Sequence, residues 1–242
     1  MFGNQSRAEN FLKMYRILEG ILEKRFSGKR QNSSVVMEYL RDDDSEPYRH
    51  ELNVCREIRN LLSHNADEEG EPLVEPSEAV LISLQNILEH VSAPKYAVDY
   101  GTPREKILWA HLNDKIIDVM HTMSKNGFSH VPVIEKGSFI GVFSAGSLFS
   151  YLEKNGLSAL DNSTRIHSIR DALSVEKHGA EKYLFMPEET TIYQVRAIFE
   201  RRSERNNRTS AIFITKNGSQ DEHLIAMLTP WDVLKDSANM NA

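Results

Sequence analysis

Three side chains near the end of a predicted helix have the chemical character needed for phosphoryl chemistry. Arg59, Asn60 and His64 fall within six positions of the sequence. A histidine titrates near neutral pH and can move a proton, and the planar guanidinium of an arginine can hold the charge of a phosphorane. The sequence therefore offers these three residues as a candidate catalytic group, in which Asn60 orients a partner or the phosphate. This chemistry requires no metal.

Helix geometry leaves a structural alternative open for the same residues. At about 100° per residue, Arg59 and His64 lie roughly 140° apart on a regular helix. They converge only if His64 lies on a loosened last turn, or if two subunits contribute them across a twofold axis. In the alternative, Arg59 pairs with Glu57 or Glu19, and His64 caps the C-terminus of its helix. The acidic segment Asp67 to Glu71 favours this alternative, because it would repel a nucleic acid.

A second pattern lies near the other end of the chain. Thr229 is followed three residues later by Asp232, at a predicted turn from a strand into a helix. This spacing places a hydroxyl and a carboxylate on one side of a helix start, where free backbone N–H groups favour a phosphate. A carboxylate there can accept hydrogen bonds from both hydroxyls of a ribose. The alternative is plain capping of the helix by Thr229, with Asp232 interacting with the helix dipole.

Apolar residues recur at helical spacing throughout the first part of the chain. The first predicted helix covers residues 11–22 and stops at Gly28, and a shorter one covers 35–40. A third has Ser45 as its N-cap and Pro47 in its first turn, and the fourth begins near Ser77. We expect these four helices to form a bundle over residues 1–95.

From residue 96 the signals alternate between strand and helix, and their order repeats. Each copy reads strand, helix, strand, strand, helix, which implies two similar units packed together. The predicted elements of the first copy cover 104–110, 113–127, a hairpin over 130–143 that turns at Lys136 and Gly137, and 144–156. Those of the second cover 182–186, 191–206, a hairpin over 209–228, and 229–238. The predicted fold class is therefore α+β, with an all-α bundle followed by a pair of β-α-β-β-α repeats.

The repeat resembles a tandem pair of CBS domains, over about 98–155 and 165–237. The segments that carry the resemblance are "HVPVIEKGSFIGVFSAGSL" and "AIFITKNGSQDEHLIAMLTPWDVL". It implies binding of an adenosine nucleotide such as AMP, ADP or ATP. The residues implied for the second repeat are Thr229, Asp232, Ala226, Phe185, Met186, Thr209, Ser210 and Ala211. A weaker site in the first repeat would use Phe128, Ser129, His130 and Ser144, because Ser147 stands where the acidic residue is expected.

The bundle is similar to HEPN domains, helical bundles that often cleave RNA as dimers. The resemblance depends on "RNLLSH" and on the helix layout. It implies a metal-independent endoribonuclease built from Arg59, Asn60 and His64, with RNA as a partner and a homodimer as the assembly.

Composition limits the remaining choices. The formal net charge of -6 argues against broad binding to nucleic acid, and the single cysteine, Cys55, excludes an intrachain disulfide and a multi-cysteine zinc site. With no apolar run long enough to span a membrane, we expect a cytoplasmic protein that has no membrane partner. Two functions follow: a nucleotide-regulated ribonuclease, or a nucleotide sensor whose bundle only dimerises or binds a partner.

Overall fold

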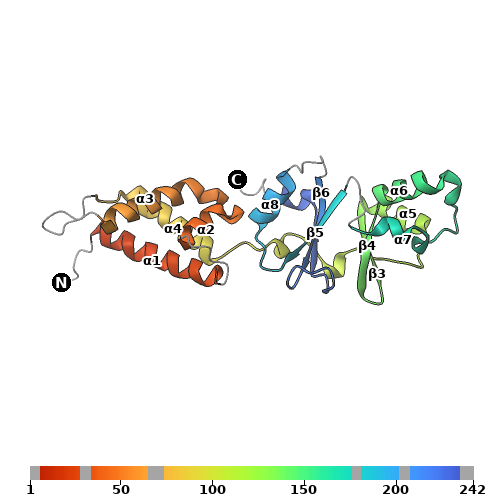
Figure 1. Cartoon of the computed structure of the whole chain (residues 1–242), viewed down its shortest axis with the longest axis horizontal. Helices are drawn as coiled ribbons and strands as arrows, with labels where there is room; N and C mark the ends of the chain where they lie inside the picture. The colour runs from red at the N-terminus through yellow and green to blue at the C-terminus, as the bar shows by residue number, and fades with distance from the viewer. Residues whose placement is uncertain (1–5, 28–33, 65–73, 176–180, 202–207, 235–242) are drawn as a thin grey trace. The chain divides into compact units, whose positions relative to one another are not determined.

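The structure is a computed structural model that describes residues 6–27, 34–64, 74–175, 181–201 and 208–234. The chain divides into two compact units, Met1–Lys95 and Tyr96–Ala242. The first unit is helical, and the second combines two sheets with helices (Figure 1). The fold class is α+β, as predicted. No helix in the described part of the chain is long and apolar enough to cross a membrane.

The four helices predicted for the first unit are present, and three of them start with a serine cap. The hydroxyls of Ser6, Ser34 and Ser77 accept hydrogen bonds from backbone N–H groups in the first helical turn, which have no partner within the helix. The elements are α1 (Arg7–Arg25), α2 (Val35–Arg41), the 3-10 helix η1 (Asp43–Tyr48), α3 (Arg49–His64) and α4 (Glu78–Ser92). Gly28, the predicted end of the first helix, and the acidic segment 67–71 lie outside the described residues.

The core of the helical unit is formed by the apolar stripes of its helices. Leu18 and Leu22 of α1 are fully buried against Leu52 of α3 and Leu84 and Ile87 of α4. Their spacing of three or four residues places them on one face of each helix, so that packing removes a continuous apolar surface from water.

One carboxylate, that of Asp44, is buried among the helices of this unit. Its Oδ2 accepts hydrogen bonds from Arg25 at 2.7 Å and from the Tyr39 hydroxyl at 3.1 Å. The His90 Nε2 lies 3.0 Å from the Asp44 backbone carbonyl oxygen. Burial, together with the negative charge of Asp44, raises the pKa of Tyr39, so the phenol remains a donor. Because a buried charge is tolerated only when it is paired, Asp44 ties η1 to α1, α2 and α4.

The third helix starts later than predicted. Ser45 and Pro47 lie in η1, and α3 begins at Arg49. The Ser45 hydroxyl donates to the Asp42 carbonyl oxygen at 2.7 Å instead of accepting from a helix N–H. The predicted N-cap was wrong because this serine closes the turn between α2 and η1.

The second unit contains two sheets with the same connectivity. In the first, β2 pairs in parallel with β3, which pairs antiparallel with β4. In the second, β5 pairs in parallel with β6, which pairs antiparallel with β7. A helix connects each parallel pair, as a parallel connection requires. The strands are β1 (Thr102–Pro103), β2 (Ala110–His111), β3 (His130–Glu135), β4 (Ser138–Ser144), β5 (Glu181–Pro187), β6 (Arg208–Thr215) and β7 (Ala226–Leu228).

Helices cover these sheets and complete two apolar cores. The α-helices are α5 (Ile116–Asn126), α6 (Ala145–Asn155), α7 (Arg170–Leu173) and α8 (Ile192–Glu200). The 3-10 helices are η2 (Ala97–Asp99), η3 (Arg104–Lys106), η4 (Leu157–Ala159) and η5 (Ile166–Ile169). A last helix begins at Pro230. The predicted hairpin turn is confirmed, because Lys136 and Gly137 both have positive φ, as a two-residue turn of this kind needs.

Two predictions about this unit were wrong. Residues 104–110 do not form a strand, because the Arg104 guanidinium donates to the Leu224 carbonyl oxygen and the Trp109 indole donates to the Arg104 carbonyl oxygen. These contacts fold the segment into η3, and only the two-residue β2 follows. The helix predicted over 191–206 ends at Glu200, because Arg201 is extended. The segment at β1 pairs with β7 and so joins the sheet of the second repeat, not that of the first.

The close approach of α7 to β4 generates a stability prediction. A Cβ added at Gly141 in β4 would lie 2.0 Å from the Leu173 carbonyl oxygen. We expect Gly141→Ala to lower the free energy of unfolding by about 1 to 3 kcal/mol, because backbone would have to move. Urea denaturation measures the change. Gly20→Ala is the matched control, because a Cβ there meets nothing within 4 Å. Replacing a glycine inside a helix with alanine should raise the free energy of unfolding by about 0.5 to 1 kcal/mol. Equal stability of Gly141→Ala and wild type would contradict the packing described.

Candidate functional site

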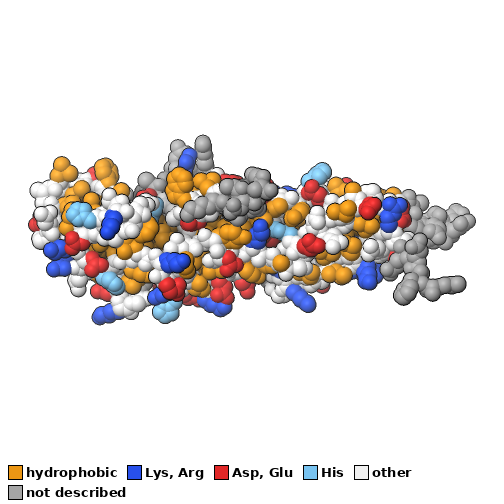
Figure 2. All heavy atoms as spheres, turned by 180° about the vertical axis from the view of Figure 1, so that it is seen from behind, with side chains coloured by type: hydrophobic (Ala, Val, Ile, Leu, Met, Phe, Trp, Pro, Cys, Tyr) orange, Lys and Arg blue, Asp and Glu red, His pale blue; other side chains and the backbone are white. Residues whose placement is uncertain are grey.

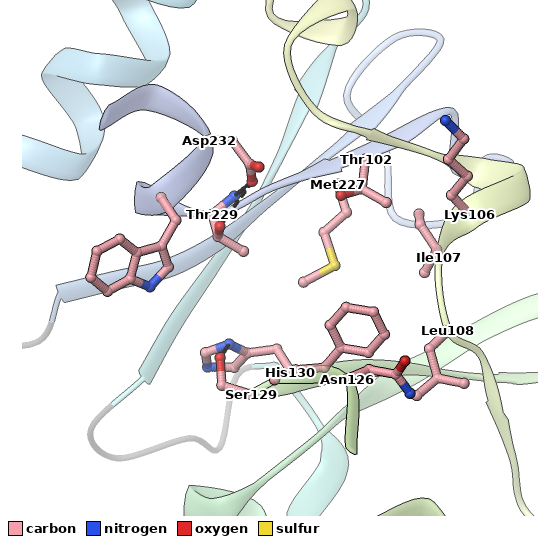
Figure 3. Close-up of a pocket in the computed structure, with 13 residues that line it drawn as sticks. Thr102, Lys106, Ile107, Leu108, Asn126, Ser129, His130, Met227, Thr229 and Asp232 are labelled. Atoms are coloured by element: carbon pink, nitrogen blue, oxygen red, sulfur yellow. Dashed lines mark hydrogen bonds between the residues drawn. The ribbon is translucent and has the colours of Figure 1, made fainter. Parts of the chain in front are cut away.

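A pocket of about 320 Å³ lies between the two repeats of the second unit (Figure 3). Its wall combines the end of β7 and the helix start after it with two segments of the first repeat, one before β2 and one between α5 and β3. The lining residues are Thr102, Lys106, Ile107, Leu108, Asn126, Gly127, Phe128, Ser129, His130, Met227, Thr229, Trp231 and Asp232. The pocket therefore joins residues that the sequence analysis assigned to two separate sites.

Thr229 and Asp232 form one polar side of the pocket. The Asp232 Oδ2 accepts two hydrogen bonds from Thr229, one from its backbone N–H and one from its hydroxyl, both at 2.8 Å. A carboxylate three residues into a helix that returns to the cap residue is half of a capping box. The carboxylate is thereby fixed at the pocket wall, and its lone pairs exceed the two that Thr229 uses.

Ser129 and His130 form the opposite side, at the start of β3 (Figure 3). The Ser129 hydroxyl lies 2.9 Å from His130 Nδ1. The other ring nitrogen, Nε2, lies 3.4 Å from Oε1 of Glu181, the first residue of β5. The imidazole therefore links the two, because one nitrogen contacts Ser129 in the pocket wall and the other contacts Glu181 of the second repeat.

The remaining lining is apolar at the bottom and charged at the edge. Ile107 and Met227 are buried, Leu108 is half-buried, and the Met227 side chain extends toward the space between the two polar sides (Figure 3). Lys106 is exposed at the rim. An apolar floor with a few converging polar groups and one exposed cation suits a small, partly anionic ligand.

Six residues expected at the second-repeat site do not line this pocket. Ala226 and Ala211 are fully buried in the sheet, and Phe185 packs edge-on against Phe139 with ring centroids 5.2 Å apart. Met186 packs against the apolar core of the second repeat. Thr209 and Ser210 lie near the start of β6. Among the described residues, none from β5 or β6 lines the pocket.

Ser144 does not line the pocket, although it is the cross-strand neighbour of His130 in the pairing of β3 with β4. It caps α6 in a capping box with Ser147, and its hydroxyl donates to Glu181 Oε2 at 2.6 Å. Phe128, Ser129 and His130, by contrast, line the pocket at Thr229 and Asp232. Three of the four residues thus line the same pocket as Thr229 and Asp232, and Ser144 lies beside His130 on β4.

Sequence reasoning missed eight lining residues: Thr102, Lys106, Ile107, Leu108, Asn126, Gly127, Met227 and Trp231. Lys106 to Leu108 lie inside the strand predicted over 104–110, so no local signal marked them as part of a site. Their role depends on how the two repeats face each other, which no local pattern expresses.

In the helical unit, Arg59 has structural partners. Its Nη2 lies 3.5 Å from Glu19 Oε1, and its guanidinium carbon lies 5.9 Å from the centroid of the Tyr15 ring. Asn60 is exposed. His64 is the last residue of α3, and its side chain lies outside the described part of the chain. The pairing with Glu19 is the one that the structural alternative expected.

The residues that the structure describes contain no group of three His, Cys, Asp or Glu side chains that could hold a metal ion. Charges of both signs are interspersed on the face that Figure 2 shows, where Lys and Arg lie beside Asp and Glu. The described side chains on that face form no continuous basic surface of the kind that binds the backbone of a nucleic acid.

Comparison with known proteins identifies part of the second unit. Residues 97–154 match the family model of the CBS domain. This range contains β2, α5, β3 and β4 and most of α6. The first repeat is therefore a CBS domain. No curated protein is detectably similar to the chain in sequence.

Several solved structures are similar to this chain at low identity. CBSX2 in complex with AMP is 16% identical, with a TM-score of 0.43, over 61% of this chain and 99% of that one. A structure of CBSX2 from Arabidopsis thaliana is also 16% identical, with a TM-score of 0.43, over 62% and 98%. CbpB in complex with c-di-AMP is 18% identical, with a TM-score of 0.46, over 65% and 95%.

The contacts of Arg59 generate a prediction about stability. The ion pair with Glu19 is partly exposed, with 34% and 28% of the two side chains accessible, so it contributes in the range of about 0.2 to 1 kcal/mol. The cation–π contact with Tyr15 adds about 0.5 to 1 kcal/mol. We expect Arg59→Ala to lower the free energy of unfolding of the helical unit by about 1 kcal/mol, measured by urea denaturation. Arg16→Ala, at an exposed arginine of α1, should change it little. Equal effects of the two substitutions would show that the contacts of Arg59 do not stabilise the helical unit.

Proposed function

We propose that the second unit binds an adenosine nucleotide, AMP, ADP, ATP or a related compound, in the pocket between its repeats. The protein is then a nucleotide sensor. The observation that carries this proposal is the placement of Thr229 and Asp232 across one pocket from Ser129 and His130. The match of the first repeat to the CBS domain supports it, because CBS pairs are adenosine-binding modules.

The size and lining of the pocket suit the parts of a nucleotide. A volume of about 320 Å³ lies at the lower end of the range of about 300 to 1,000 Å³ typical of small-molecule sites. Ile107, Leu108 and Met227 offer the apolar contacts that a base needs. The Asp232 carboxylate can accept from ribose hydroxyls, and Lys106 supplies a positive charge for a phosphate.

The lining also favours a ligand that carries both a sugar and an anion. Asp232 is the only carboxylate among the lining residues, and Lys106 is the only lysine. A free phosphate would meet one exposed cation and one repelling acid, whereas a nucleotide uses the acid for its ribose and the cation for its phosphate. This division of roles distinguishes a nucleotide site from a simple anion site.

The helical unit has a structural or partner-binding role in this proposal. The pairing of Arg59 with Glu19 favours that role, because a guanidinium neutralised by a carboxylate is a poorer binder of phosphorane charge. The alternative is the sequence-based hypothesis of RNA cleavage by Arg59, Asn60 and His64, with RNA as a partner and a homodimer as the assembly.

Binding of AMP to wild type and to Asp232→Asn tests the proposed site. The asparagine carbonyl oxygen can still accept from Thr229, so the cap is retained while the charge toward the ribose is lost. We expect at least a tenfold weaker affinity by isothermal titration calorimetry, since a hydrogen bond to a charged group contributes about 1.5 to 3 kcal/mol. Asp171→Asn, an exposed acid at the start of α7, is the matched control. Equal affinity for AMP in all three proteins would remove Asp232 from the site, and no binding to wild type would refute the proposal.

Incubation of the full chain with single-stranded RNA tests the role of the helical unit. We expect no cleavage with or without a chelator and with or without AMP, because Arg59 is engaged by Glu19. Cleavage that resists chelator and disappears in both His64→Ala and Arg59→Ala would contradict the non-catalytic role and establish the ribonuclease. Sedimentation of the same samples reports whether the chain is a dimer.

A further inference from the structure

Polar contacts among three side chains connect the pocket to the first strand of the second repeat. Ser129 lies in the pocket wall, and its hydroxyl is 2.9 Å from His130 Nδ1. His130 Nε2 is 3.4 Å from Glu181 Oε1. The imidazole is 14% exposed and packs edge-on against the Tyr183 ring, with centroids 5.8 Å apart. Its orientation is therefore restricted by packing as well as by its polar partners.

Glu181 is held in place by groups on its other oxygen. Its Oε2 accepts hydrogen bonds from the Ser144 hydroxyl at 2.6 Å and from the Tyr183 hydroxyl at 2.9 Å. Burial and the charge of Glu181 raise the pKa of Tyr183, so its phenol remains a donor. A Cβ added at Gly146 would lie 2.7 Å from Glu181 Oε2, so the carboxylate uses space that only a glycine leaves open.

The chemistry of the three groups determines where the hydrogens lie. An ionised carboxylate only accepts hydrogen bonds, so the imidazole nitrogen that faces it must carry a hydrogen. In a neutral imidazole the other nitrogen is then an acceptor. Nδ1 would accept from the Ser129 hydroxyl, and the lone pairs of the Ser129 oxygen would face the pocket.

We infer that Glu181 is a positioning residue of the pocket, which fixes His130 as the Nε2–H tautomer and so makes Ser129 a hydrogen-bond acceptor toward the ligand. This inference rests on the proposed function only for the identity of the ligand. The arrangement of hydrogens follows from Ser129, His130 and Glu181 in the free protein. A carboxylate that orients a histidine in this way acts through its hydrogen bond and does not touch the ligand.

An acceptor in the pocket wall selects ligands that present an N–H or O–H group. The amino group of adenine is such a donor, and the corresponding oxygen of hypoxanthine is an acceptor. AMP and IMP therefore form a pair of ligands that differ at one hydrogen-bonding group. Since a site built to pair with a donor is left unpaired by an acceptor, the wild-type pocket should prefer AMP.

Glu181→Gln should exchange the donor and acceptor roles along the contacts from residue 181 through His130 to Ser129. Two hydroxyls, from Ser144 and Tyr183, donate to the Oε2 position, so the glutamine carbonyl oxygen belongs there. Its amino group then faces His130 Nε2 and donates to it. The imidazole becomes the Nδ1–H tautomer, Nδ1 donates to Ser129, and the serine hydrogen turns toward the pocket.

The first test uses the free protein and no nucleotide. Nitrogen-15 chemical shifts of the His130 ring distinguish the two neutral tautomers. We expect the Nε2–H form in wild type and the Nδ1–H form in Glu181→Gln. Glu153→Gln, which removes the same charge from an exposed position on α6, should leave the Nε2–H form. The same tautomer in wild type and Glu181→Gln would overturn the inference, whether or not the proposed function holds.

The second test compares the affinities of AMP and IMP by calorimetry. We expect wild type to prefer AMP about three- to tenfold, and Glu181→Gln to lose or invert this preference. Ser129→Ala, at an exposed position, should also lose it, and Glu181→Gln should change the ratio no further in that background. A preference retained in Ser129→Ala would overturn the specificity role. Failure of wild type to bind either nucleotide would refute the proposed function and the role of Ser129 in nucleotide choice. The tautomer measurement would still decide the role of Glu181.

Discussion

The backbone N–H groups at the start of a helix have no partner within that helix, so they need another hydrogen-bond acceptor. In the second unit, side chains supply this acceptor where each hairpin leads into a helix. In the second repeat, Asp232 reaches back to Thr229 and places a carboxylate at the pocket wall. In the first repeat, Ser147 occupies the equivalent position in a capping box with Ser144. The Ser144 hydroxyl also donates to the carboxylate of Glu181 in β5. The same capping requirement thus places an acid at the pocket wall in one repeat and a residue that links the two repeats in the other.

Two charged groups of the helical unit pair with other side chains of that unit. Asp44 is fully buried and receives hydrogen bonds from Arg25 and Tyr39, and Arg59 pairs with Glu19 beside Tyr15. A charge that is removed from water requires a partner, so paired groups of this kind hold neighbouring helices together. Arg59 therefore has a structural role in the bundle.

Local patterns predicted the elements well where the chain's own turn chemistry decides them. Ser77 caps α4, Lys136 and Gly137 form the hairpin turn, and the two β-α-β-β repeats have the predicted order. The predictions failed where distant residues intervene. Arg104 bonds to the Leu224 carbonyl oxygen across the two repeats, and the segment 104–110 folds as a turn despite its strand-like sequence. Ser45 likewise closes a turn instead of capping a helix, because Asp42 offers its carbonyl oxygen.

The sequence by itself determined the α+β class, the repeat, and the placement of Thr229 and Asp232 together at a helix start, because helical periodicity, turn residues and a three-residue spacing are local properties of the chain. Only the tertiary structure decided which residues lie opposite that pair. The segments before β2 and β3 line the pocket, whereas Phe185 and Ala211 are used in the sheet and core. It also decided that Glu181, far from Ser129 in sequence, contacts the same imidazole. The physical reason is that a pocket between two repeats is formed by their packing against each other, and the free energy of that packing belongs to the whole apolar interface, not to any short segment.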